Sequence, residues 1–113
     1  MIIWGGAADD LSAYYNDGAA YDPSNDTWTA LSSTTLSTRA LVSTVWTGSK
    51  IILWAGSQQT DGKIYDPAMD SWSAMTSSST GRQGTPAVWT GSKMLVWGGS
   101  ASGDSNTGDT YNP

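Results

Sequence analysis

The sequence contains no cysteine, no histidine, no phenylalanine and no glutamate. Without cysteine the chain can form neither disulfides nor thiolate metal sites. Without histidine, cysteine and glutamate it lacks the usual general bases, thiol nucleophiles and metal ligands. Aspartate remains, but no aspartate pair stands out from those that favour turns. We therefore expect a protein that is not an enzyme and that carries no cofactor.

Positive charge is also scarce, with five Lys and Arg against ten acidic residues and a net charge of −5. Nucleic acids and anionic membrane surfaces are bound through basic patches, so neither is an expected partner. No apolar run approaches the ~20 residues of a membrane-spanning helix, so membrane insertion is not expected either. The low charge, together with many Ser, Thr, Gly and Trp residues, favours a secreted or cell-surface bacterial protein. A cytoplasmic location stays open.

What the sequence does contain is an internal repeat, built from three motifs that recur in the same order. An apolar stretch ending in glycine occurs as MIIWGG at 1–6, IILWAG at 51–56 and MLVWGG at 94–99. The other two motifs are YDPSNDTW at 21–28 with YDPAMDSW at 65–72 and YNP at 111–113, and VWTGSK at 45–50 and 88–93. Such self-similarity at a period of about forty to fifty residues predicts stacked supersecondary units.

Turn chemistry divides each unit into four antiparallel strands. Gly48-Ser49 and Gly91-Ser92 predict two-residue hairpins, and the Asp-Pro pairs predict type I turns. Asp26 and Asp70 recur in those turns, where we expect them to bond nearby backbone N–H groups. The expected strands, in order within the unit, are 40–47 and 84–90; 1–5, 50–55 and 93–98; 18–22, 62–66 and 108–111; and 27–31 and 71–75. No segment shows a helical period, so we expect no helix.

The recurring tryptophans are expected to be packed between the units. Their positions repeat in register, which favours a scaffold role over an exposed sugar-stacking platform. This set comprises Trp4, Trp28, Trp46, Trp54, Trp72, Trp89 and Trp97.

These motifs resemble the Kelch repeat in its bacterial form. The resemblance rests on apolar strands that close in Gly5-Gly6 and Gly98-Gly99, and on a tyrosine that precedes a tryptophan by seven residues in both YDP motifs. Ala55-Gly56 departs mildly from the double glycine. A Kelch repeat implies an all-β protein, a β-propeller of four-stranded antiparallel blades.

The repeat predicts a single partial propeller domain over residues 1–113, with about 2.5 blades. Blade one covers 1–31 and lacks its first strand, blade two covers 39–75, and blade three covers 82–113 and lacks its last strand. Because closed propellers typically have ~4–8 blades, we expect either further blades of the same parent chain or several copies that close one ring.

A ligand site is expected on the loops that vary between repeats, since recognition residues concentrate on variable loops of a rigid scaffold. In an antiparallel meander these loops share one rim. They are 7–17, 32–39, 57–61, 76–84 and 100–107. Tyr14 and Tyr15 do not recur, and they are candidates for an exposed aromatic contact with a ligand.

Arg39 and Arg82 are further candidates, because each lies seven residues before a recurring tryptophan. The Kelch resemblance implies that such arginines reach a central pocket and hold acidic ligand groups. The alternative is structural ion pairs with neighbouring aspartates. Asp9, Asp10 and Asp104 are weak calcium candidates, since their loops supply oxygen atoms without a recognised ligand spacing; the alternative is solvated turn acids.

The leading functional hypothesis is a non-enzymatic binding or scaffolding module that recognises a protein or a polysaccharide. Two alternatives stay open: a self-assembling subunit of a ring or fibre, and a segment of a larger propeller enzyme whose active site lies elsewhere.

Overall fold

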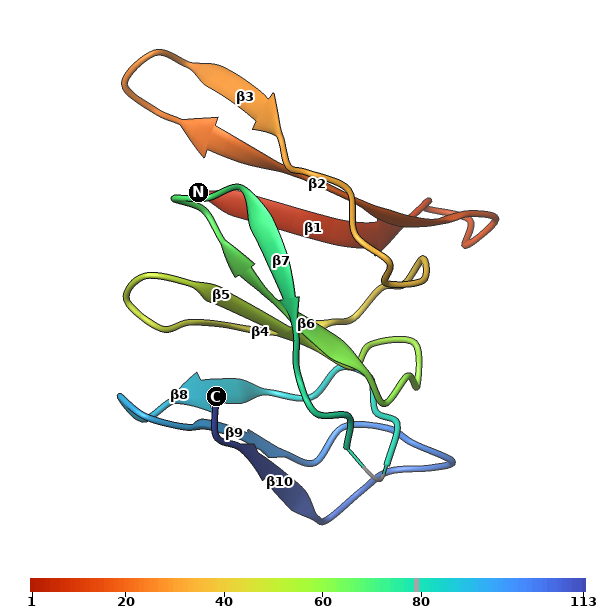
Figure 1. The fold of residues 1–113 in the computed structure, drawn as a ribbon. Coiled ribbons are helices and arrows are strands. Elements are labelled where there is room, and N and C mark those ends of the chain that lie inside the picture. Colours follow the sequence, from red (N-terminus) through yellow and green to blue (C-terminus); the bar gives the residue numbers. More distant parts are fainter. Residues whose placement is uncertain (79) are drawn as a thin grey trace.

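Ten strands in three antiparallel sheets make up the computed structural model, which describes residues 1–78 and 80–113 (Figure 1). The first sheet contains β1 (Ile2–Ala7), β2 (Tyr14–Asp22) and β3 (Thr27–Ala30). The middle sheet contains β4 (Ser43–Trp46), β5 (Ile51–Trp54), β6 (Gly62–Asp66) and β7 (Ser71–Ala74). The third sheet contains β8 (Ala87–Trp89), β9 (Met94–Trp97) and β10 (Gly108–Tyr111).

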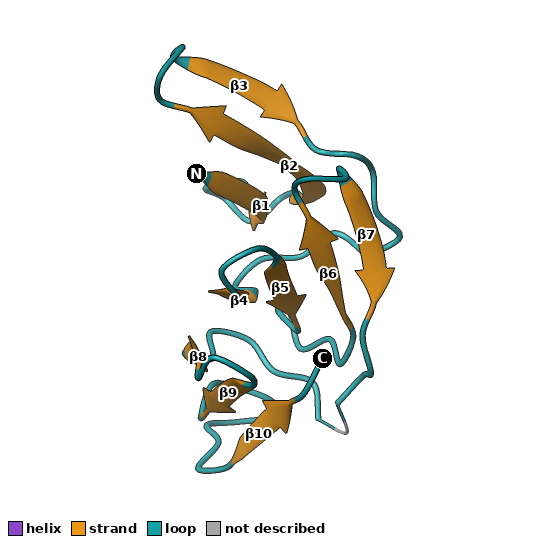
Figure 2. Ribbon diagram, turned by 60° about the vertical axis from the view of Figure 1, so that its left-hand side comes forward, coloured by secondary structure: helices purple, strands orange, loops and turns teal. Residues whose placement is uncertain are grey.

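Among the described residues, 1–78 and 80–113, none is helical, as Figure 2 shows, so the all-β class is confirmed. The described residues accordingly offer no helix that is long and apolar enough to cross a membrane.

Within each sheet, every strand pairs with the next one along the chain, and the pairing repeats from sheet to sheet. In the middle sheet, Trp46, Ile51, Tyr65 and Trp72 form one row across the four strands. In the third sheet the corresponding row is Trp89, Met94 and Tyr111. Equal rows mean that the repeated motifs occupy equivalent places, so the repeat in the sequence is also a repeat in structure.

The predicted hairpins are present in both VWTGSK motifs. The Thr47 amide donates to the Lys50 carbonyl at 2.9 Å, and the Thr90 amide donates to the Lys93 carbonyl at 2.9 Å. In the first of these hairpins, Gly48 has a φ of 102°, a backbone conformation that residues with a side chain rarely adopt.

The main hydrophobic core lies between the middle and third sheets. Val45, Ile52 and Trp54 project from the middle sheet and meet Met94 and Val96 of the third. Between the first and middle sheets, the rings of Trp4 and Trp72 meet edge to face, with centroids 6.2 Å apart. The three sheets therefore pack face against face in chain order.

The expectation that all seven tryptophans are packed between sheets is only partly right. Trp54 is 4 % exposed, and Trp4, Trp72 and Trp89 are half-buried. The expectation is wrong for the other three, which are more than half exposed: Trp28, Trp46 and Trp97. Trp28 and Trp97 lie on the two outer sheets. They are exposed because no described sheet covers the faces on which they lie, although they recur in register with buried tryptophans.

The two aspartates of each YDP turn accept hydrogen bonds from different donors, and the donors of the second aspartate differ from those predicted. Asp22 and Asp66 accept a backbone N–H two residues ahead, from Ser24 at 2.9 Å and Ala68 at 3.0 Å. Asp26 and Asp70 have positive φ and accept the hydroxyl of the tyrosine that opens the motif. The turn is thus closed by a Tyr–Asp bond rather than by the local backbone bonds that we expected for Asp26 and Asp70.

In the middle sheet this Tyr–Asp pair also holds Ser32, which lies in the segment that follows β3 of the first sheet. Asp70 Oδ1 accepts the Ser32 amide at 2.9 Å and the Tyr65 hydroxyl at 2.7 Å, and the Trp72 indole N–H donates to the Ser32 carbonyl at 2.8 Å. The Ser32 amide, and then the Tyr65 hydroxyl, lower the pKa of Asp70. Burial, followed by the bond to Asp70, raises the pKa of Tyr65 to about 12.

The raised pKa of Tyr65 predicts a loss of stability in alkali. The folded state favours the neutral phenol, so this contribution is complete below the unfolded pKa of 10.0 and is lost as the pH rises towards about 12. Urea unfolding across this range should show a steeper fall for the wild type than for Tyr65→Phe. Equal slopes for the wild type and Tyr65→Phe would contradict the assignment.

Candidate functional site

The loops that vary between repeats lie at one end of the three sheets, and the short hairpins β4–β5 and β8–β9 lie at the other (Figure 1). We call the end that carries the variable loops the loop rim. Its described residues are 8–13, 32–39, 55–61, 76–78, 80–84 and 98–107. Residue 79, within the predicted segment 76–84, lies outside the described residues.

Arg39 is fixed to the first sheet through its backbone. Its amide donates to the Tyr15 carbonyl at 3.0 Å, and its carbonyl accepts the Gly6 amide at 2.9 Å. The approach is close, because a Cβ added at Gly5 would lie 2.8 Å from the Arg39 carbonyl oxygen. The double glycine near the end of β1 therefore leaves room for the backbone of this arginine.

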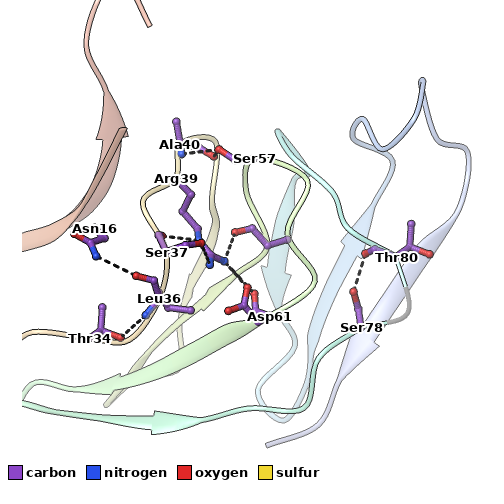
Figure 3. A network of polar contacts seen from close by, with 11 residues as sticks. Asn16, Thr34, Leu36, Ser37, Arg39, Ala40, Ser57, Asp61, Ser78 and Thr80 are labelled. Carbon is purple, nitrogen blue, oxygen red and sulfur yellow. Dashed lines mark hydrogen bonds and ion pairs between the residues drawn. The ribbon is translucent and has the colours of Figure 1, made fainter. Parts of the chain in front are cut away.

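The side chain of Arg39 turns the other way, into the β5–β6 loop of the middle sheet (Figure 3). Nη1 donates to Asp61 Oδ1 at 2.7 Å and to the Ala55 carbonyl at 3.3 Å. Nε and Nη2 donate to the carbonyl and the hydroxyl of Ser37, at 3.0 and 2.7 Å. The residue is only 1 % exposed, so its guanidinium is enclosed by its own protein.

Arg82 repeats this arrangement between the middle and third sheets. Its amide donates to the Gln59 carbonyl at 3.3 Å, and its carbonyl accepts the Gly56 amide at 2.9 Å. Its Nη atoms donate at 2.7 Å to three acceptors of the β9–β10 loop: the Gly98 carbonyl, Ser105 Oγ and Thr107 Oγ1. In the part of the chain that the structure describes, these acceptors are neutral, whereas Arg39 has a carboxylate.

The two arginines thus join the three sheets at the loop rim. Each one bonds the preceding sheet through its backbone and the following loop through its guanidinium. Charge-assisted hydrogen bonds of this kind are about twice as strong as neutral ones, so they hold the rim loops in place. The recurrence of arginine seven residues before Trp46 and Trp89 was the signal for this role.

Tyr14 and Tyr15 are exposed, but they do not lie in a loop as the sequence suggested. They begin β2, where Tyr14 pairs with Ala7 and Tyr15 with Gly6. The register shifts between Trp4 and Gly6, and this irregularity lets both strands run further than predicted. The two rings therefore stand on opposite faces of a strand, which fixes them more firmly than a free loop would.

Leu11 is a third exposed, largely apolar side chain of the same β1–β2 segment, and it was not among the candidates expected from the sequence. It lies at the tip of the β1–β2 loop with a φ of 58°, and most of its side chain is exposed. A lone apolar residue between Asp10 and Ser12 in a loop was the available signal. We call Leu11, Tyr14 and Tyr15 the rim patch.

The calcium candidates are not gathered by the fold. Asp9 and Asp10 belong to the β1–β2 loop, whereas Asp104 belongs to the β9–β10 loop of the third sheet. Asp10 accepts the Ser12 amide at 3.0 Å, and hydrogen bonds from Ser12 lower its pKa. Across the described ranges, no three Asp, Glu, His or Cys side chains come together as a possible metal site.

Comparison of the sequence with protein-family models and with curated proteins found no match. The functional argument therefore rests on the geometry of the loop rim.

Proposed function

We propose that the three sheets are consecutive blades of a Kelch-type β-propeller, and that the chain is a non-enzymatic binding module. The proposal is supported by the recurrence of strand order, pairing register and arginine bridges from one sheet to the next. Face-to-face packing of successive four-stranded units is the arrangement that propeller blades use.

The ligand is a protein or a polysaccharide, and it binds at the loop rim. The observation that carries this proposal is the rim patch: exposed side chains on a β1–β2 segment to which Arg39 is bonded. Aromatic rings on a rigid support lose little entropy on binding, and they are frequent energetic centres of interfaces.

The charge around the rim patch favours a neutral or basic ligand. Asp9, Asp10 and Asp17 lie within a few residues of the tyrosines, and all three are exposed. The nearest basic side chain in the sequence, Arg39, is buried and occupied by its own partners. An acidic ligand would therefore be repelled at this patch.

The test is binding of the purified protein to arrays of soluble polysaccharides and of random peptides, followed by titration of the hits. Replacing Tyr14 and Tyr15 together by alanine should weaken binding at least about tenfold, which corresponds to about 1.4 kcal/mol. Met69→Ala, which removes an exposed apolar side chain from the β6–β7 turn outside the rim, should leave affinity unchanged. Hits that bind both variants as tightly as the wild type would contradict the proposal.

Self-assembly is the second candidate, and the outer faces of the end sheets favour it. Ile3 and Trp28 are exposed on the first sheet, and Val88 and Trp97 on the third. These are two different surfaces, so a contact between them would join copies head to tail into a ring or a fibre. Sedimentation velocity of the same samples distinguishes the candidates, because a concentration-independent monomer is compatible only with the first.

A further inference from the structure

The β5–β6 loop begins with four consecutive residues in the left-handed region of backbone space. They are Ala55, Gly56, Ser57 and Gln58, with φ values of 57°, 84°, 46° and 61° in that order. The equivalent runs in the first and third sheets are two residues long and consist of glycine alone, Gly5-Gly6 and Gly98-Gly99. Residues with a side chain adopt this region only at a steric cost, and such strain clusters at functional sites. We call residues 55–58 the left-handed turn.

The connections that precede β4 and β8 hold the left-handed turn from its two sides. The Ser57 amide donates to the Ala40 carbonyl at 3.0 Å, and Ser57 Oγ accepts the Ala40 amide at 3.1 Å (Figure 3). On the other side, a Cβ added at Gly81 would overlap the Gln58 carbonyl oxygen, so the two backbones are in close contact. These contacts fix the strained backbone, and they make the left-handed turn a rigid part of the loop rim.

The two polar side chains of the left-handed turn differ in what they contact. Ser57 is turned towards the protein, where its hydroxyl bonds the backbone of Ala40, so this side chain stabilises the turn. Gln58 is exposed, and it contributes its backbone to the packing against the neighbouring connection. Glycine would adopt the conformation of Gln58 without the steric cost. The geometry therefore points to a role for the Gln58 amide outside the fold.

The chemistry of the left-handed turn is neutral and suited to hydrogen bonding. The side-chain amide of Gln58 offers two N–H donors and one acceptor oxygen without a charge, and the next residue, Gln59, is a second exposed amide. The nearby charges are engaged, because the Asp61 carboxylate is paired with Arg39 and the guanidinium of Arg82 is buried. Donors and acceptors of this kind match the hydroxyl groups of an uncharged sugar.

Two hydrogen bonds connect the left-handed turn to the rim patch. The Arg39 amide donates to the Tyr15 carbonyl, and the next residue, Ala40, accepts the Ser57 amide. The Cα atoms of Tyr15 and Ser57 therefore lie within about 15 Å of each other. A ligand that contacts both places is a chain of several linked units rather than a single small molecule.

We propose that the ligand of the loop rim is a neutral polysaccharide, and that Gln58 is the residue that binds its hydroxyl groups. A tyrosine of the rim patch supplies an apolar ring surface, and the amide of Gln58 supplies the hydrogen bonds that fix the orientation of the chain. Sites that combine apolar surface with a few well-placed polar groups are typical of specific ligand binding. This ligand class rests on the proposed function of the loop rim.

The test measures binding to four neutral polymers (dextran, laminarin, xyloglucan and galactomannan) and to two anionic ones (alginate and polygalacturonate). We expect saturable binding to at least one neutral polymer and none to the anionic ones. Gln58→Gly should weaken that binding at least about tenfold, while the midpoint of urea unfolding stays the same or rises, because glycine relieves the strain. Leu41→Gly is the matched control. It removes an exposed side chain at another positive φ, 57°, outside the left-handed turn, so affinity should not change.

The outcomes separate this ligand class from the proposed function. Weaker binding after replacement of Tyr14 and Tyr15 by alanine, with unchanged binding of Gln58→Gly, would overturn the role of Gln58 and leave the binding module standing. Binding to peptides or to the anionic polymers alone would overturn the neutral polysaccharide, as would a failure to bind any of the four neutral polymers. Hits that bind the tyrosine variant and Gln58→Gly as tightly as the wild type would overturn both proposals.

Discussion

Replacing Trp54 by alanine is expected to lower the free energy of unfolding by about 3–5 kcal/mol. Trp54 is 4 % exposed and belongs to the core between the middle and third sheets. Truncation removes the indole and leaves a cavity that the surrounding strands cannot fully close. Urea denaturation followed by far-ultraviolet circular dichroism measures the loss.

Trp97→Ala is the matched control for this change. Trp97 ends β9 as Trp54 ends β5, and both face a glycine of the next strand, Gly108 and Gly62. Because Trp97 is 65 % exposed, its truncation should cost less than about 1 kcal/mol, as is usual for surface positions. Equal losses for the two variants would contradict the packing described here and would mean that the outer face of the third sheet is covered in solution.

The ten strands could be predicted because their signals are local. The hairpin glycines, the Asp-Pro turns and the constant spacing from tyrosine to tryptophan all act within a few residues of the structure they determine. The end of β1 escaped prediction for the same reason. Its extension to Ala7, and the start of β2 at Tyr14, depend on a register shift near Gly5 that periodicity alone does not reveal.

Burial of the tryptophans could not be read from the sequence, because it depends on what covers each sheet. Trp54 and Trp97 occupy identical places in the repeat, yet one is buried and the other exposed. The contacts of the arginines also depend on neighbouring sheets, so they could not be predicted either. Recurrence identified Arg39 and Arg82, but it could not show that their backbones bond one sheet and their guanidinium groups the next.

Replacing Asp61 by alanine is expected to destabilise the protein by about 2–4 kcal/mol, because it leaves a buried guanidinium without its carboxylate. Arg39 is 1 % exposed, and its Nη1 lies 2.7 Å from Asp61 Oδ1. Asp61 itself is 46 % exposed, and solvent screening therefore places the loss below that of a fully buried pair. Asp104→Ala, on the equivalent loop of the third sheet and without an ion-pair partner among the described residues, should change stability by less than about 0.5 kcal/mol.

If Arg39 joins the sheets through Asp61, the effects of replacing these two residues should not be additive. Arg39→Met keeps most of the aliphatic volume and removes the charge, so Asp61→Ala should cost much less in its presence than in the wild type. The difference, obtained from urea denaturation of the four proteins, is the coupling free energy of the pair, and we expect about 1–3 kcal/mol. Additive losses would mean that Asp61 and Arg39 act separately. In that case the β5–β6 loop would be held by the bonds of Ser57 to the Ala40 backbone and of Gly56 and Gln59 to the Arg82 backbone. Hydrogen exchange of residues 55–61 would then be unchanged by the removal of the guanidinium.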